Sequence, residues 1–145
     1  MKEKEDFNCE GNLVALDFFG CSFQSLNSPG FLLTEAKKAA EMARMTVLAA
    51  TIVPFQPQGL SLNITLAESH LTIHTYPEQG YAAVDIFTCG TGKPKKAAEH
   101  LRMALNPTVV LMSSRRRGVI PTSKKIENDS LGTGEPPCLS ELRPS

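Results

Sequence analysis

The spacing of apolar residues changes several times along the chain, and each change marks a predicted element. Residues 11–19 form an apolar run that predicts a strand, and residues 46–55 form another that is rich in β-branched side chains and closed by Pro54. Residues 60–66 alternate strictly between apolar and polar side chains. This period of two is typical of a strand with one face on the core and one face that is wet or functional.

Helical spacing appears twice, in residues 33–45, for which Thr34 is the candidate cap, and in residues 95–105. Turns are predicted at residues 27–30 and 76–80, and further strands at residues 71–75, 81–88 and 107–112. Two helices packed on one face of a mostly antiparallel sheet bury the apolar faces of all these elements. The pattern therefore predicts an α+β fold, a two-layer sandwich.

Length and composition predict one folded unit. The chain has 145 residues, and a chain of this length buries roughly two-thirds of the surface that its unfolded form exposes. From Gly118 onward the sequence shifts to Pro, Gly, Ser and charged residues with almost no apolar periodicity. We expect a single domain over residues 1–117 and a flexible tail over residues 118–145.

The charge balance argues against several partners. Fifteen Lys and Arg offset fifteen Asp and Glu, so no net field would attract nucleic acid or an anionic membrane surface. No apolar stretch approaches the ~18 residues that span a bilayer, so we expect a soluble cytoplasmic protein. The cysteines lack the paired spacing of a zinc or redox motif and are expected to be thiols: Cys9, Cys21, Cys89 and Cys138.

Candidate chemistry is concentrated between Glu68 and Gly90, where a serine, two histidines, a carboxylate and a thiol lie close in sequence. A serine hydroxyl at a strained backbone position can attack the preceding carbonyl carbon and convert the amide to an ester. Loss of the serine α-proton then expels the ester and leaves dehydroalanine, which hydrolyses to a pyruvoyl group. This route needs a polar group that stabilises the oxyanion and a base of near-neutral pKa, such as histidine.

Strand geometry limits how these residues can meet. His70 and His74 would lie ~13 Å apart on a strand, too far to share one ion, so no metal site is expected. Ser69 and His74 fall on opposite faces of a regular strand. Direct contact between these two would require a bulge, a turn at Ser69 or an approach through the main chain.

The segment from Glu68 to Gly90 resembles, almost residue for residue, the small prokaryotic S-adenosylmethionine decarboxylases, and the resemblance extends over about residues 11–118. These enzymes make their own pyruvoyl cofactor by breaking the chain at a Glu-Ser bond. The resemblance implies cleavage between Glu68 and Ser69, a β chain of residues 1–68, and an α chain that starts at a pyruvoyl group derived from Ser69. This group would replace pyridoxal phosphate as an electron sink.

The resemblance also implies roles for individual residues. His74 would serve the cleavage, Ser61 of the Pro57-Gln58-Gly59-Leu60-Ser61 pattern would assist it, and Cys89 would donate a proton during turnover. Substrate contacts would come from Phe55, Leu71 and Glu78, by stacking on adenine at Phe55 and by holding the ribose hydroxyls at Glu78.

The chain departs from the family in two places. It reads Gly11-Asn12-Leu13 where the family commonly has a histidine, and it has Leu62 where a small residue often follows the processing serine. We expect the bulkier Leu62 to alter the pocket beside Ser61.

The activity implied is decarboxylation of the small molecule S-adenosylmethionine to the aminopropyl donor for spermidine synthesis, by a homodimer of processed αβ protomers. One alternative keeps the pyruvoyl chemistry but acts on ornithine or arginine. Another alternative is an unprocessed binding module without catalysis.

Overall fold

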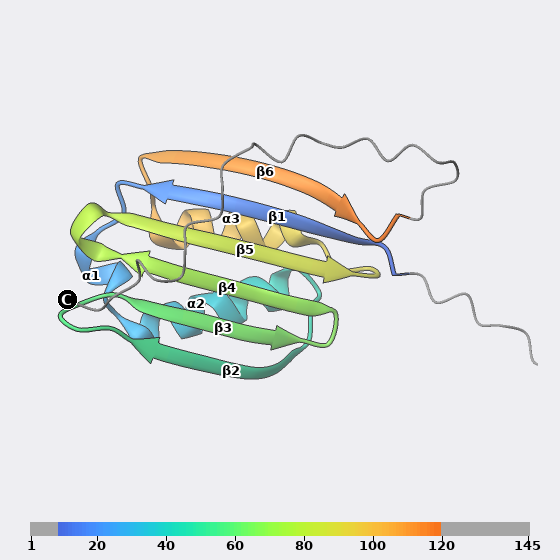
Figure 1. Ribbon diagram of the computed structural model, residues 1–145, viewed down its shortest axis with the longest axis horizontal. Helices are drawn as coiled ribbons and strands as arrows, with labels where there is room; N and C mark the ends of the chain where they lie inside the picture. Colours follow the sequence, from blue (N-terminus) through green and yellow to red (C-terminus); the bar gives the residue numbers. More distant parts are fainter. Residues whose placement is uncertain (1–8, 120–145) are drawn as a thin grey trace, which may run out of the picture.

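One six-stranded sheet with helices on one side makes up the part of the chain that the structure describes, residues 9–119 of a computed structural model (Figure 1). The elements in chain order are β1 (Gly11–Phe19), α1 (Phe23–Leu26), α2 (Pro29–Met42), β2 (Val47–Pro54), β3 (Leu60–Leu66), β4 (Ser69–Tyr76), the 3-10 turn η1 (Pro77–Gln79), β5 (Tyr81–Cys89), α3 (Pro94–Leu105) and β6 (Val109–Arg117). The expected α+β sandwich is confirmed.

The sheet is antiparallel throughout, in the order β2-β3-β4-β5-β1-β6. The strands β2 to β5 are joined by short connections, whereas β1 enters between β5 and β6. The register places Ser61 opposite His74, and His74 opposite Ala83. These three positions therefore share one face of the sheet.

The core lies between the sheet and the two long helices, α2 and α3, which run behind the strands in Figure 1. Alanines on the buried faces of both helices let the helix backbones approach each other and the sheet. The strands contribute larger side chains such as Phe18, Leu62 and Ile73, all fully buried. Burial of this apolar surface is the main favourable term in the stability of the fold.

Three elements differ from the sequence prediction. The helix α2 begins at Pro29. Proline suits the first position of a helix because a backbone N–H at that position would have no partner within the helix, so its absence costs nothing. Thr34 consequently lies inside α2, where its hydroxyl donates to the Gly30 carbonyl. The strand β6 continues to Arg117, beyond the expected residues 107–112, and the short helix α1 was not anticipated.

Three of the four cysteines lie in the described part of the chain. Cys9, Cys21 and Cys89 are free thiols, while Cys138 and nearly all of the expected tail lie outside the described residues. Within residues 9–119, no helix combines the length and the apolar character that crossing a membrane requires.

The face of the sheet opposite the helices, here called the outer face, is not covered by any element within residues 9–119 (Figure 1). By register it carries Ser61 and His74 together with several large apolar side chains that are between 39% and 57% exposed. These apolar residues are Phe19, Val53, Tyr76, Val109 and Leu111. Exposed apolar side chains gathered on an uncovered sheet face are typical of an interaction surface.

Candidate active site

Ser69 begins β4 directly after the turn at Ala67 and Glu68. Its φ of 154° lies in a region that L-residues other than glycine seldom occupy. The hydroxyl Oγ of Ser69 lies 3.6 Å from the thiol Sγ of Cys89, the last residue of β5. We call the group formed by Glu68, Ser69 and Cys89 the cleavage end.

Main-chain N–H groups hold both the carbonyl oxygen and the side chain of Glu68, the residue that precedes Ser69. The Cys89 N–H donates to the Glu68 carbonyl oxygen at 2.9 Å, and the Thr46 N–H donates to Oε2 of the Glu68 side chain at 3.0 Å. A donor on a carbonyl oxygen polarises the carbon and stabilises negative charge that develops on the oxygen. The cleavage end therefore combines an unusual backbone conformation at Ser69, an adjacent hydroxyl and a fixed oxyanion donor.

Ser61 and His74 form a second group at the other end of β3 and β4. They are direct partners in the register of these strands, and Ser61 Oγ lies 2.7 Å from His74 Nδ1. Both side chains are half-buried on the outer face. The imidazole can exchange a proton with the hydroxyl at this distance, as a general base requires.

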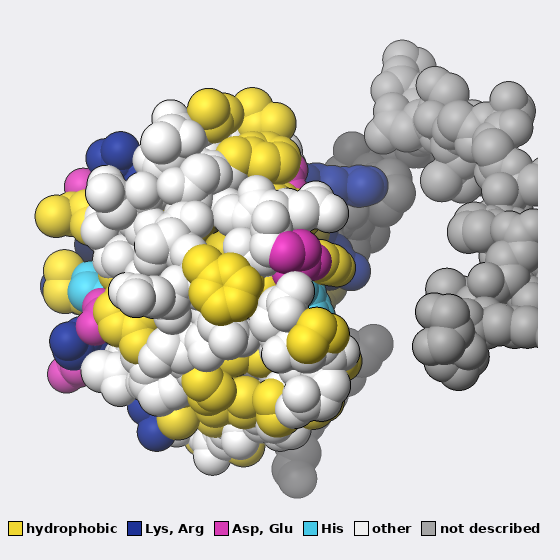
Figure 2. Space-filling view, turned by 90° about the vertical axis from the view of Figure 1, so that its left-hand side faces the viewer, with side chains coloured by type: hydrophobic (Ala, Val, Ile, Leu, Met, Phe, Trp, Pro, Cys, Tyr) yellow, Lys and Arg dark blue, Asp and Glu magenta, His cyan; other side chains and the backbone are white. Residues whose placement is uncertain are grey.

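A pocket of about 300 Å³ opens beside this pair. It is lined by Phe55, Gln58, Leu60, Ser61, His74, Thr75, Tyr76 and Glu78. We call these residues the pocket end. Figure 2 shows the molecule from the side on which the pocket end lies, where apolar and uncharged side chains predominate and an acidic side chain stands among them. The pocket therefore offers an aromatic surface, a carboxylate and an imidazole to a small ligand.

An aromatic stack supports the pocket from the sheet. The ring of Tyr81 stacks on Tyr76, which lines the pocket, and on Phe19, with centroid distances of 5.4 and 4.9 Å. The Tyr81 hydroxyl donates to Asp17 Oδ1 at 2.5 Å, and this bond, followed by burial, raises the pKa of Tyr81 to about 12. The neutral phenol is thus fixed as a donor, which holds the stack in place.

Within one copy of the chain, the Ser69–Cys89 group lies far from the Ser61–His74 group. Ser69 and His74 are five residues apart on the same strand, a separation of ~16 Å for extended backbone. Ser69 contacts Cys89, whereas His74 contacts Ser61. The structure therefore places the sequence-predicted residues at two ends of the sheet, with Ser61, His74, Phe55 and Glu78 gathered at one end and Ser69 and Cys89 at the other.

Leu71 and Leu62 lie on the helix side of the sheet. Both are fully buried in the core, so neither side chain reaches the pocket. Any contact of Leu71 with a ligand would have to come from its main chain. Leu62 points away from Ser61 and does not crowd the pocket, because successive strand residues face opposite sides.

Sequence reasoning assigned no role to Gln58 and Tyr76, although both line the pocket. Their positions in the sequence could have indicated a role, because Gln58 lies within the pattern that ends at Ser61 and Tyr76 lies between His74 and Glu78. Alternation along β4 puts Tyr76 on the same face as His74.

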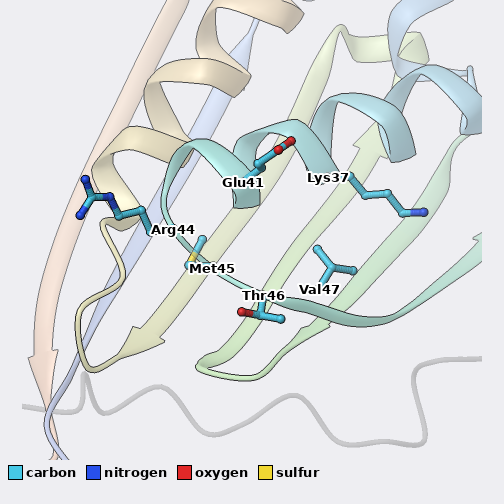
Figure 3. Close-up of a pocket in the computed structure, with 6 residues that line it drawn as sticks. All are labelled: Lys37, Glu41, Arg44, Met45, Thr46 and Val47. Carbon is cyan, nitrogen blue, oxygen red and sulfur yellow. The ribbon is translucent and has the colours of Figure 1, made fainter.

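A wider depression of about 660 Å³ lies at the end of α2 and includes Thr46, which contacts Glu68. It is shallow, and Figure 3 shows that Arg44 points away from Lys37 and Glu41, so the charged groups do not converge on a ligand. The pocket end and the cleavage end are therefore the better candidates for chemistry.

Known proteins of one family resemble this chain in sequence. The family model described as S-adenosylmethionine decarboxylase matches residues 12–118. A relative from Brevibacillus brevis, named S-adenosylmethionine decarboxylase proenzyme, is 41% identical over 79% of this chain and 86% of its own length. A Prochlorococcus marinus protein of the same name is 46% identical over 66% of this chain and 77% of its own length.

A solved structure shows the same fold. The crystal structure of the adenosylmethionine decarboxylase from Aquifex aeolicus VF5 matches with a TM-score of 0.72 and 29% identity, over 78% of this chain and 94% of that one. Sequence and fold agree over the region that holds both ends of the candidate site. The chain belongs to the S-adenosylmethionine decarboxylase family.

Proposed function

We propose that this protein is a self-processing decarboxylase that converts S-adenosylmethionine to its decarboxylated form, with a pyruvoyl group derived from Ser69. Membership of the family supports the reaction. The observation that carries the proposal is the Cys89 N–H bonded to the Glu68 carbonyl oxygen next to the Ser69 hydroxyl.

Self-cleavage uses groups that this chain already holds. Ser69 Oγ attacks the Glu68 carbonyl carbon, and the Cys89 N–H stabilises the oxyanion until the Ser69 nitrogen leaves and an ester remains. Removal of the Ser69 α-proton expels the Glu68 carboxylate and leaves dehydroalanine. Addition of water and loss of ammonia complete the pyruvoyl group at the new N-terminus of the α chain.

The residues present fit the resident group and the substrate. The pyruvoyl group supplies an electron sink for the carbanion formed when carbon dioxide leaves. The Cys89 thiol lies beside the modified position and can donate a proton to carbon. At the pocket end, Phe55 offers an exposed ring for a nucleobase, and Glu78 offers carboxylate oxygens for sugar hydroxyls.

The proposed active unit is a homodimer in which each site takes its two ends from different copies. Within one copy, Ser69 and His74 are separated by ~16 Å of strand, so neither self-cleavage nor substrate binding has all of its groups. The uncovered outer face carries exposed apolar residues and supplies the surface for a second copy.

A two-fold symmetric dimer would form two equivalent active sites. Two outer faces packed about a two-fold axis that runs across the strands keep the lateral position of each strand and exchange its ends. The start of β4 in one copy then lies over the end of β4 in the other. Cys89 lies on the outer face by register, and the Ser69 hydroxyl reaches this thiol at 3.6 Å, so both would meet Ser61, His74 and the pocket of the partner copy.

Intact mass spectrometry tests the proposed processing. The purified protein should give two fragments divided between Glu68 and Ser69, with the α chain lighter than the unmodified fragment by one ammonia. Ser69→Ala should stay whole and release no carbon dioxide, while Ser114→Ala, a serine exposed on β6, should be cut normally. An active preparation made only of uncut chain would contradict the proposal.

Substrate choice is tested separately, by carbon dioxide release from S-adenosylmethionine, ornithine and arginine. An aromatic ring and a carboxylate in one pocket favour the nucleoside. Faster release from ornithine or arginine would keep the chemistry and overturn the substrate. No release from any of the three by an uncut chain would favour a binding module.

A further inference from the structure

Gln58 forms a hydrogen bond with Glu78, the residue whose carboxylate is proposed to bind the sugar hydroxyls of the substrate. Its Nε2 donates to Oε2 of Glu78 at 3.3 Å, and both residues line the pocket. Gln58 is half-buried, whereas Glu78 is exposed. The exposed carboxylate thus has a protein donor on one of its two oxygens.

The loop that carries Gln58 is fixed on both sides. The next residue, Gly59, donates its N–H to Oδ1 of Asn27 at 3.0 Å, and its carbonyl accepts from the Phe55 N–H at 2.8 Å. Gly59 has a φ of 90° and is buried, and a side chain at this position would meet the Thr75 carbonyl. Gln58 therefore precedes a backbone position that is held by two hydrogen bonds, which fixes the point from which its side chain reaches Glu78.

We infer that Gln58 is a positioning residue that holds the Glu78 carboxylate for a neutral diol and disfavours a guanidinium group at the same carboxylate. The inference rests on the proposed function and adds the basis of its specificity. An ionised carboxylate has about four acceptor sites on two oxygens. With the amide on Oε2, Oε1 remains open to hydroxyl donors.

A guanidinium group would compete with the Gln58 amide for the Glu78 carboxylate. Bidentate binding of a guanidinium uses both carboxylate oxygens in one plane, and the Gln58 amide already takes one of the two lone pairs of Oε2. Two sugar hydroxyls can instead approach the open oxygen and the remaining lone pair from the pocket. Gln58 thus favours S-adenosylmethionine over arginine at the same carboxylate.

Two substitutions separate this role from simple packing. Gln58→Leu removes the donor at similar size, and we expect the KM for S-adenosylmethionine to rise about tenfold, the typical cost of a lost bond to a charged group, with kcat and self-cleavage unchanged. The relative rate with arginine should rise. Gln79→Leu, an exposed glutamine next to Glu78 that does not line the pocket, should keep the KM of the native enzyme.

Gln58→Glu adds a readout that packing alone would not move. At neutral pH two carboxylates repel each other, so the KM should rise more than in Gln58→Leu. As the pH falls, a proton bound between the two carboxylates restores a donor, and the KM should return toward the native value. His74 and Tyr76 are the other titratable groups that line the pocket, and they are common to native and variant proteins.

The outcomes are distinct. Native KM in Gln58→Leu, or a pH dependence of Gln58→Glu that matches the native enzyme, would overturn the role of Gln58 while leaving the proposed function intact. A loss of kcat without a change in KM would overturn it as well. If the native protein is neither cut nor active, the proposed function fails first and the inference falls with it.

Discussion

The two ends of β4 differ in what they are made of. At the cleavage end the main chain supplies most of the features that favour the reaction: the φ of Ser69 and the Cys89 N–H that donates to the Glu68 carbonyl. At the pocket end side chains supply these features: the Ser61–His74 pair and the residues that line the pocket. The chain thus separates the bond to be broken from the base and the binding surface.

This separation has a physical consequence. A chain that held the nucleophile and the base together could cut itself as soon as it folded. In the proposed homodimer, cleavage instead depends on the assembly of two copies.

The largest effect is expected at the cleavage end. Cys89→Ala keeps the main-chain N–H that contacts the Glu68 carbonyl but removes the thiol. We expect the chain to be cut, with kcat for decarboxylation reduced about 10²-fold or more, the usual contribution of a general acid. Intact mass and carbon dioxide release measure the two steps separately.

Cys9→Ala, which removes an exposed thiol, is the matched control and should be cut and active. If Cys89→Ala remained whole, the main-chain contact would not suffice for cleavage. The comparison of a backbone end with a side-chain end would then be wrong.

A smaller effect is expected between the ends, on the helix side of β4. Leu71→Ala should lower the free energy of unfolding by about 2–5 kcal/mol, because the side chain is fully buried and leaves a cavity. The exposed Leu48→Ala should change it by less than about 0.5 kcal/mol. Denaturant unfolding measures both. An altered KM in Leu71→Ala at unchanged stability would instead place Leu71 at the substrate.

The smallest effect concerns the stack beside the pocket end. A pKa of about 12 for Tyr81 exceeds the ordinary value of about 10, so the stability it contributes is fully present below pH ~10 and is lost as the pH rises through about 12. Asp17→Asn should move the phenol absorbance midpoint of Tyr81 down toward its ordinary value, and Asp85→Asn should move it much less. An unchanged midpoint in Asp17→Asn would contradict the bond as the main cause.

Much of the fold could be predicted from periodicity. The strict alternation of residues 60–66 and the turn signal before Tyr81 located β3 and β5 closely, because one face of each strand is buried. The start of α2 was missed because Thr34 looked like a cap, while Pro29 began the helix one turn earlier. The length of β6 was missed because it is an edge strand that is mostly exposed, so burial imposes no alternation on it.

The candidate site could be predicted in its residues but not in its arrangement. Alternation correctly indicated that Ser69 and His74 have no simple direct contact along β4. It did not show that Ser69 would meet Cys89 while His74 met Ser61, because these contacts depend on how neighbouring strands align. The role of Gln58 required the distance between two loops, which no local pattern contains.

Co-expression of two variants shows whether each site combines the cleavage end of one copy with the pocket end of the other. Ser69→Ala and His74→Ala chains carry different tags and are analysed by intact mass, alone and together. The account predicts that neither is cut alone and that the His74→Ala chain is cut when both are present, because its Ser69 meets the intact His74 of its partner. If both chains stay whole in the mixed dimer, the two ends belong to one copy and the account is contradicted.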